Sequence, residues 1–416
     1  MWKRWRIRIL LFLAVLGPGF ITANVDNDSG GVLTYSQAGA QYGYTLLWTM
    51  IPITIALMVV QEMCARMGVV TGKGLSDLIR EEFGLRVTFL IMVVLVVVNY
   101  TNVVTEFIGI AGSLHLFHVS KFISVPICAF LVWALVLRGD YKSTEKIFLV
   151  ASMVYIAYIF AGVLAQPNWH ESLLATVQLP AKSVWRDKGY IYMAVGVVGT
   201  TIAPWMQFYL QSSIVEKGVA VKDYPTSRLD VIVGCFFTDL IAWFIVVACA
   251  ATLFVHGMGA IQVAADAAEA MRPLAGDYAF VLFAFGLFNA SLFAASILPL
   301  STAYTVCEGL GVESGVDKTF KEAPFFYWLY TLLIAGGAIS VLILPDAQLI
   351  NVAIFSQVLN GVLLPVVIIL MLLLINRTDL MGEHKNSRLW NVIAWSTSVI
   401  VIGMTFAMLW GMVPGH

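Results

Sequence analysis

Apolar runs of similar length alternate with short polar segments along the whole chain. A helix needs about 20 mostly apolar residues to cross a bilayer, and on that criterion we expect about eleven crossings. They are predicted at residues 8–34, 44–65, 87–114, 120–137, 147–165, 190–215, 229–255, 277–306, 325–344, 347–375 and 390–413. Because no intervening segment is long enough to separate domains, we expect a single all-α transmembrane domain over residues 1–416.

The amino-acid composition supports an integral membrane protein. Of the 416 residues, 60% are hydrophobic and 12% are charged, whereas a soluble domain has about 25% charged residues. The net charge of −1 gives no reason to expect nucleic acid as a partner. The cysteines are scattered without close pairs, which argues against a disulfide framework or a thiolate metal site.

Lysine and arginine concentrate in alternate polar segments. Placing the N-terminus in the cytoplasm puts most of them on that side, as the positive-inside rule requires. We therefore expect a multi-pass protein of the cell membrane, with its N-terminus in the cytoplasm and its C-terminus outside. We expect it to act as a monomer within the lipid bilayer.

The first apolar run is interrupted by the polar stretch VDNDSGGV at residues 25–32. Glycine costs about 1 kcal/mol against alanine in a helix, and serine and asparagine compete for backbone hydrogen bonds. We expect the first helix to break near Asp28 to Gly31.

The sixth run has the same character, with Gly196, Gly199 and then Ala203-Pro204. Proline removes a backbone donor and clashes with the preceding turn, so carbonyls near residues 197–201 lose their helical partners. Breaks in the first and sixth of about eleven helices suggest a LeuT-type inverted repeat, with helices 1–5 and 6–10 related and the breaks meeting at the membrane midplane. Ordinary kinks made by glycine and proline are the alternative.

Acidic side chains lie inside the predicted spans at Asp26, Asp28, Glu106 and Asp239. A charge at the bilayer centre costs at least about 2.5–3.5 kcal/mol, so such residues are functional by default. No lysine or arginine lies centrally in any predicted span, so an imported cation or protons must neutralise these acids. Carboxylate, carbonyl and hydroxyl oxygens suit Mg²⁺, Ca²⁺ or Mn²⁺.

Several segments resemble the NRAMP family of divalent transition-metal transporters. They are GPGF at 17–20 followed by Asp28, QYGYTLLW at 41–48, AVGVVGTTIAP at 194–204, SQVLNGVLLP at 356–365 and NRTDLMG at 376–382. The resemblance covers nearly the whole chain. It implies the inverted-repeat fold and transport of a divalent metal ion.

The chain departs from the family pattern at positions that contact metal. The family's Asp-Pro-Gly-Asn reads Asp-Ser-Gly-Gly at residues 28–31, so Gly31 replaces the metal-binding asparagine. Its Met-Pro-His reads Ala-Pro-Trp at 203–205, and only Glu106 remains of the acidic pair in the third helix, where Val103 replaces the aspartate. Losing a thioether and an amide leaves a wider, harder site, which is similar to the NRAMP-related magnesium transporters of prokaryotes.

The resemblance implies a ligand set for the transported ion, and no resident cofactor. Asp28 is the expected principal ligand, Thr200 and Ala203 offer carbonyls, and the Thr200 hydroxyl reaches the ion's water shell. Gly31 leaves room in the site. Gln357 is either an outer amide or a helix–helix hydrogen bond, and Asp26 either adds charge or faces away. Glu106 and Asp239 are either relay groups or buried protonated acids.

The leading interpretation is uptake of Mg²⁺, and also Mn²⁺, by alternating access without proton coupling, since Trp205 and Val103 replace the family's titratable residues. One alternative is a proton-coupled Mn²⁺/Fe²⁺ transporter of the same family. Another is an organic-solute transporter that holds a substrate carboxylate at helix N-termini, which two aspartates would repel. No nucleophile–base pair is evident, so we do not expect an enzyme.

Overall fold

The computed structural model describes residues 17–138, 141–257, 261 and 264–412, and all regular structure within them is helical. Nine helices in this part of the chain are long and apolar enough to cross a membrane. One of them, Ser29–Thr71, turns at Gly43 and makes two crossings, and the apolar helix Lys121–Leu137 is slightly shorter than the rest. The described spans thus follow the predicted ones in order, which confirms the all-α membrane fold. The start of the first predicted span, residues 8–16, lies outside the described residues.

The helices occur in a simple order along the chain. They are α2 (Pro18–Val25), α3 (Ser29–Tyr42), η1 (Gly43–Thr49), α4 (Met50–Thr71), α5 (Leu75–Phe83), α6 (Leu85–His115), α7 (Lys121–Arg138), α8 (Tyr141–Val154), α9 (Ile156–Leu164), α10 (Trp169–Val177), η2 (Val184–Arg186), α11 (Lys188–Thr201), α12 (Pro204–Lys217), η3 (Val221–Asp223), α13 (Tyr224–Cys249), η4 (Ala250–Phe254), α14 (Ala264–Leu310, kinked at Gly276), α15 (Pro324–Ile343), α16 (Asp346–Ile375), α17 (Thr378–Met381), η5 (Gly382–His384) and α18 (Arg388–Met412).

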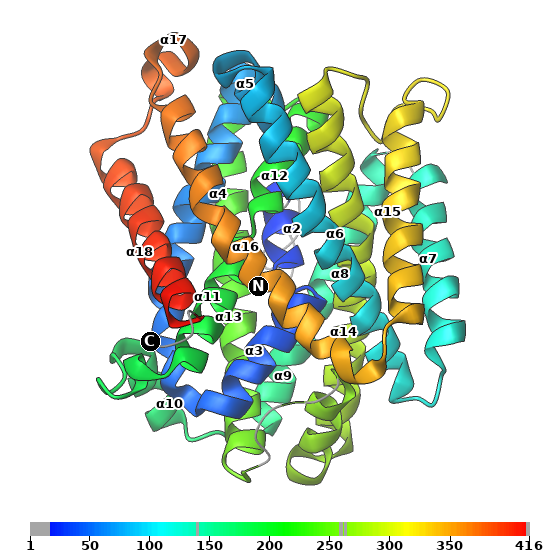
Figure 1. The fold of residues 1–416 in the computed structure, drawn as a ribbon, viewed down its shortest axis with the longest axis vertical. Helices are drawn as coiled ribbons and strands as arrows, with labels where there is room; N and C mark the ends of the chain where they lie inside the picture. Colours follow the sequence, from blue (N-terminus) through cyan, green and yellow to red (C-terminus); the bar gives the residue numbers. More distant parts are fainter. Residues whose placement is uncertain (1–16, 139–140, 258–260, 262–263, 413–416) are drawn as a thin grey trace, which may run out of the picture.

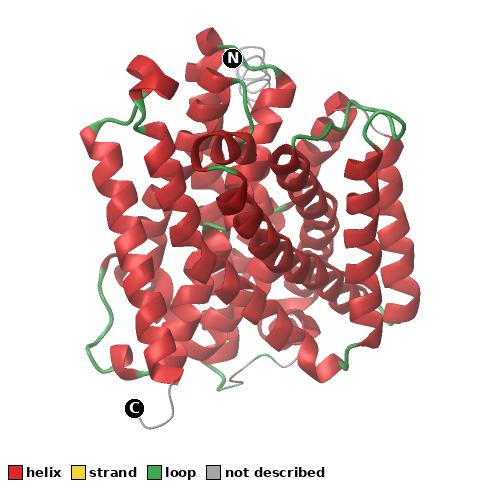
Figure 2. Ribbon diagram, turned by 45° about the horizontal axis from the view of Figure 1, so that its top comes forward, coloured by secondary structure: helices red, strands yellow, loops and turns green. Residues whose placement is uncertain are grey.

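The two ends of the bundle carry different short helices. Figure 1 shows α5 and α17 at one end and α10 at the other, with α18 at one edge and α7 and α15 at the opposite edge. Figure 2 shows loops gathered at the two ends and long helices between them. The sequence does not predict the short helices α5 and α10. Each has 9 residues and lies in a polar connection, whereas the prediction relies on apolar runs long enough to cross a membrane.

The first crossing breaks between α2 and α3, slightly earlier than predicted. Residues 26–28 are non-helical, whereas Gly30 and Gly31 lie in the first turn of α3. Asp28 causes this placement: its backbone is extended, and its side chain accepts a hydrogen bond from the Gly31 N–H at 2.6 Å, as an N-cap does. The glycines instead permit close packing, because a Cβ on Gly30 would overlap the Gln357 amide.

The sixth crossing breaks between α11 and α12, as the sequence predicts. α11 ends at Thr201 and α12 begins at Pro204, so proline occupies the first helical position, where its missing N–H costs nothing. In a continuous helix the N–H of residue 204 would bond the Thr200 carbonyl, and proline cannot supply that bond. The break therefore exposes polar backbone in the middle of the bundle.

Helix α2 is held tightly against α13. The Asp230 carboxylate on α13 accepts hydrogen bonds from the backbone N–H groups of Gly17 at 2.7 Å, Gly19 at 2.8 Å and Phe20 at 3.1 Å. A Cβ on Gly234 would lie 2.7 Å from the Phe20 Cα, so the two helices touch through their backbones. This contact fixes the half-helix that precedes the first break.

Candidate metal-ion site

Asp28 lies at the start of α3 and faces a second acid on α6. Its side chain is buried, and its carboxyl contacts the Glu106 carboxyl directly. Glu106 also accepts a hydrogen bond from the Ser29 N–H at 3.1 Å, so it helps to cap the same helix. Two buried carboxylates side by side repel each other unless a proton or a cation lies with them. The pair is therefore a place where positive charge is needed.

Oxygen atoms from both helix breaks meet beside Gly31. A Cβ at this position would overlap the Asp26 carbonyl oxygen and lie 3.1 Å from the Thr200 hydroxyl oxygen. The Gly31 N–H is bonded to Asp28, so the carboxylate belongs to the same group. The Thr200 hydroxyl is buried without a hydrogen-bond partner among the described residues. A carboxylate, a carbonyl and a hydroxyl thus surround one position between the two breaks.

Ala203 lines the sixth-helix break, but its carbonyl is engaged. It accepts a hydrogen bond from the Met206 N–H at 3.1 Å. With the Gln207 amide in the orientation that satisfies its neighbours, that side chain also donates to the Ala203 carbonyl at 2.7 Å. Two donors occupy both lone pairs of a carbonyl oxygen. Thr200 is therefore the better placed of the two predicted α11–α12 ligands in this conformation.

Gln357 belongs to a cluster of amides between α16 and α6. Its oxygen accepts a hydrogen bond from Asn360 at 2.8 Å, and Asn360 and Asn102 exchange hydrogen bonds at 3.1 Å. The Gln357 nitrogen lies against Gly30, close to the start of α3. The Gln357 nitrogen also donates to the Asn102 oxygen on α6 over a long 3.5 Å. The structure thus places an N–H of Gln357, rather than its oxygen, beside the start of α3.

The Asp26 side chain and its backbone carbonyl have different surroundings. The carbonyl lies at the Gly31 position, whereas the strongest electrostatic neighbour of the carboxyl is Asp239 on α13, ahead of Asp28. The sequence left open whether the Asp26 side chain adds charge to the site or faces away. In the structure its main acidic neighbour is on another helix, and its backbone oxygen is the group nearest to the candidate site.

Protein side chains alone do not complete a metal shell here. Within the described residues, no three His, Cys, Asp or Glu side chains lie close enough together to hold a metal ion. An ion at this position would need the Asp26 carbonyl, the Thr200 hydroxyl and water beside the Asp28 carboxylate. The carbonyl was not predicted, because a backbone oxygen leaves no signal in the sequence.

One end of the bundle carries a cavity with a polar lining. A cavity of about 690 Å³ is lined by the ends of α3, α11 and α16 that lie towards α10. Uncharged polar side chains line much of it, including Gln37, Gln41, Tyr192, Gln348 and Asn351. The cavity thus presents amide and phenol groups rather than charged ones.

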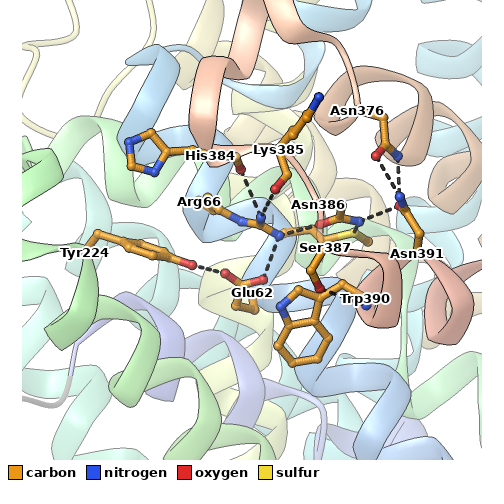
Figure 3. A network of polar contacts seen from close by, with 11 residues as sticks. Glu62, Arg66, Tyr224, Asn376, His384, Lys385, Asn386, Ser387, Trp390 and Asn391 are labelled. Atoms are coloured by element: carbon orange, nitrogen blue, oxygen red, sulfur yellow. Dashed lines mark hydrogen bonds and ion pairs between the residues drawn. The ribbon is translucent and has the colours of Figure 1, made fainter.

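A polar network around Arg66 lies at the opposite end of the bundle (Figure 3). Arg66 pairs with Glu62 on the same helix at 3.0 Å and donates to the carbonyls of His384 at 2.9 Å and Lys385 at 3.1 Å. Glu62 also accepts a hydrogen bond from Tyr224 at the start of α13. Together with the contact between Asp230 and α2, the network ties α4, α13 and the segment before α18 together at the end that carries α5 and α17.

Comparisons with known proteins agree with this architecture. Residues 19–411 match the family described as natural resistance-associated macrophage protein-like. The divalent metal cation transporter MntH of Deinococcus radiodurans is 27% identical to this chain over an alignment of 423 residues, gaps included. The alignment covers 98% of this chain and 91% of the relative.

Solved structures share the fold. A crystal structure of the Eremococcus coleocola manganese transporter, in complex with an aromatic bis-isothiourea substituted compound, matches with a TM-score of 0.75 and 22% identity and covers 94% of this chain and 85% of its own. MhsT in complex with L-phenylalanine matches with a TM-score of 0.59 and 14% identity over 95% of this chain and 98% of its own. The predicted transporter fold with broken helices is therefore confirmed.

Proposed function

This chain belongs to the natural resistance-associated macrophage protein-like family, and on that premise we propose that it carries divalent metal ions across a membrane, Mg²⁺ above all and Mn²⁺ as well. The observation that carries the proposal is the meeting of the Asp28 carboxylate, the Asp26 carbonyl and the Thr200 hydroxyl beside Gly31, between two helix breaks. MntH of Deinococcus radiodurans, named as a divalent metal cation transporter, supports the substrate class.

The preference for Mg²⁺ follows from the kind and number of ligands. Mg²⁺ gives up its water reluctantly and usually binds through one or two carboxylates while it keeps several waters. The candidate site offers oxygen atoms, and Ala203 stands where the related family pattern has a thioether. Soft ligands select softer ions such as Cd²⁺, whereas an oxygen site with room for water suits a hard ion.

Transport without proton coupling is the second part of the proposal. Trp205 and Val103, both buried, stand where the related family pattern has a histidine and an aspartate. Neither side chain titrates, and no histidine lies near the centre of a predicted span. An inside-negative potential favours entry of a doubly charged ion by about 4.6 kcal/mol per 100 mV, which drives uptake without a second ion. We further propose a monomer in the cell membrane with its N-terminus in the cytoplasm.

The test uses purified protein in liposomes with a clamped membrane potential. Uptake of Mg²⁺, Ca²⁺, Mn²⁺ and Cd²⁺ is followed with an internal metal-sensitive dye, and a pH dye is followed in parallel. We expect Mg²⁺ uptake, partial competition by Mn²⁺ and no metal-dependent acidification. Uptake of Mn²⁺ but not Mg²⁺, with acidification in a fixed ratio to the metal, would instead establish a proton-coupled transporter of transition metals.

A further inference from the structure

A second pair of acids lies on the other side of the first helix break. Asp26, between α2 and α3, and Asp239, in the middle of α13, are 2% and 4% exposed. Asp239 is the strongest electrostatic neighbour of Asp26. Neither oxygen of either carboxyl receives a hydrogen bond within the described residues. The pair is distinct from Asp28 and Glu106, which contact each other and share the backbone N–H groups at the start of α3.

The neighbours of this pair offer oxygen atoms rather than hydrogen-bond donors. The Thr54 hydroxyl lies beside Asp239 but gives its hydrogen to the Met50 carbonyl at 2.7 Å. Tyr35, which lies close to both acids, is bonded at 2.7 Å to the Thr201 hydroxyl.

Asn27 supplies an independent sign that this position can take a cation. Its nitrogen donates to the carbonyl of Thr238 at 2.9 Å and to the hydroxyl of the same residue at 2.6 Å. These bonds join the residue after Asp26 to the residue before Asp239. Asn27 is fully buried, and its side-chain oxygen has no hydrogen-bond partner among the residues that the structure describes. A buried amide oxygen without a donor is a costly arrangement that a bound cation or its water would relieve.

Charge decides what kind of ligand fits. Neither carboxyl receives a hydrogen bond from a lysine or arginine in the part of the chain that the structure describes. Arg66, a buried cation on α4, is already paired with Glu62. An ionised carboxylate that is buried without a partner costs several kcal/mol in order of magnitude. One divalent cation neutralises two carboxylates at once, and carboxylate and amide oxygens are the ligands that a hard ion prefers.

We propose that Asp26 and Asp239, with the Asn27 oxygen, form a second site for a divalent cation that keeps part of its water shell. The site is separate from the Asp28 position and lies on the α13 side of the same helix break. The inference rests on the proposed transport of divalent ions and adds a second position to the ion's path.

The test measures equilibrium Mn²⁺ binding by electron paramagnetic resonance on the full chain in lipid nanodiscs. In Asp28→Ser protein, which lacks the first carboxylate, we expect saturable binding of Mn²⁺ to remain. Adding Asp239→Asn, an isosteric change without charge, should weaken that binding at least tenfold. Adding Asp223→Asn, the same change at an exposed position before α13, should leave it unchanged.

Thermal unfolding gives a second measurement that does not depend on the Mn²⁺ signal. Without metal, Asp239→Asn should unfold at a temperature at least as high as the parent, because it removes an unpaired buried charge. Added Mg²⁺ should raise the unfolding temperature of Asp28→Ser protein but not that of the double variant. If the double variant still binds Mn²⁺, or if Asp28→Ser alone abolishes binding, the second site is wrong. The proposed function fails separately, if Asp28→Ser protein transports Mg²⁺ normally.

Discussion

The Asp28 carboxylate accepts a hydrogen bond at 2.6 Å from the backbone N–H of Gly31, the glycine beside which the Asp26 carbonyl and the Thr200 hydroxyl also lie. Asp28 thus has two tasks: it caps α3, and it brings a negative charge to the candidate ion position. An alanine at this position would remove both at once. A serine would keep a capping oxygen and remove only the charge, which makes it the more informative substitution.

Gly31 is required by packing. A Cβ at this position would overlap the Asp26 carbonyl oxygen, and that oxygen belongs to backbone that cannot rotate away. We expect Gly31→Ala to lower the free energy of unfolding by about 1–3 kcal/mol, as overpacking does. Gly403→Ala is the control, because a Cβ there would meet nothing within 4 Å, and it should be neutral or stabilising. Equal unfolding temperatures for the two variants would contradict the close approach at Gly31.

Ala203 is the position at which a softer ligand can be added. Ala203→Met should lower the Cd²⁺ concentration that halves Mg²⁺ uptake by at least tenfold, because a thioether attracts soft ions. Ala203→Leu adds similar bulk without sulfur, so it should slow Mg²⁺ uptake without increasing Cd²⁺ sensitivity. The measurement is competition in proteoliposomes. If methionine and leucine have the same effect, ligand softness does not set the selectivity.

Asp230 holds α2 against α13. Asp230→Ala removes the acceptor for the N–H groups of Gly17, Gly19 and Phe20 and should let α2 move away. Cys235 is fully buried and follows Gly234, which packs directly against Phe20 of α2, so its exposure reports this movement. We expect its modification by a small maleimide to become several-fold faster in Asp230→Ala protein, measured by mass spectrometry.

The control for that experiment is Asp223→Ala, which removes an exposed acid near the start of the same helix. It should leave the labelling rate of Cys235 unchanged. Unaltered labelling in Asp230→Ala protein as well would mean that α2 stays in place without the carboxylate.

Arg66 and Glu62 form a buried ion pair at the end of the bundle that carries α5 and α17. Their side chains are 7% and 1% exposed. Arg66→Ala leaves Glu62 buried without its cation, which costs about 3–5 kcal/mol. Arg377→Ala, which removes an exposed partner of Asp379 and Glu82, should cost less than about 1 kcal/mol. Thermal unfolding of both variants in detergent measures the difference, and similar losses would show that burial does not strengthen the Arg66 pair.

The sequence predicts the helices better than the contacts between them. The spans follow from the length of apolar runs, and the sixth break follows from Pro204, because these are local properties of the chain. The first break was placed too late, because the glycines suggested a flexible segment whereas the Asp28 side chain caps the helix before them.

The neighbours of Asp26 could be identified only from the tertiary structure. Its carbonyl at Gly31 is a backbone group without a residue-type signal, and its acidic neighbour Asp239 lies more than 200 residues away in the sequence. The alternation of apolar and polar segments, together with the composition, indicates which residues lie within the membrane. They do not reveal which buried residues face each other.

The most direct test of the account is Mg²⁺ uptake by Asp28→Ser protein in proteoliposomes at a clamped, inside-negative potential. The wild-type chain is measured beside it at equal reconstitution, and thermal unfolding checks that both are folded. We predict that wild-type protein takes up Mg²⁺ and that Asp28→Ser protein, with its helix still capped, does not exceed empty liposomes. Mg²⁺ uptake at the wild-type rate by folded Asp28→Ser protein would contradict the proposed ion site.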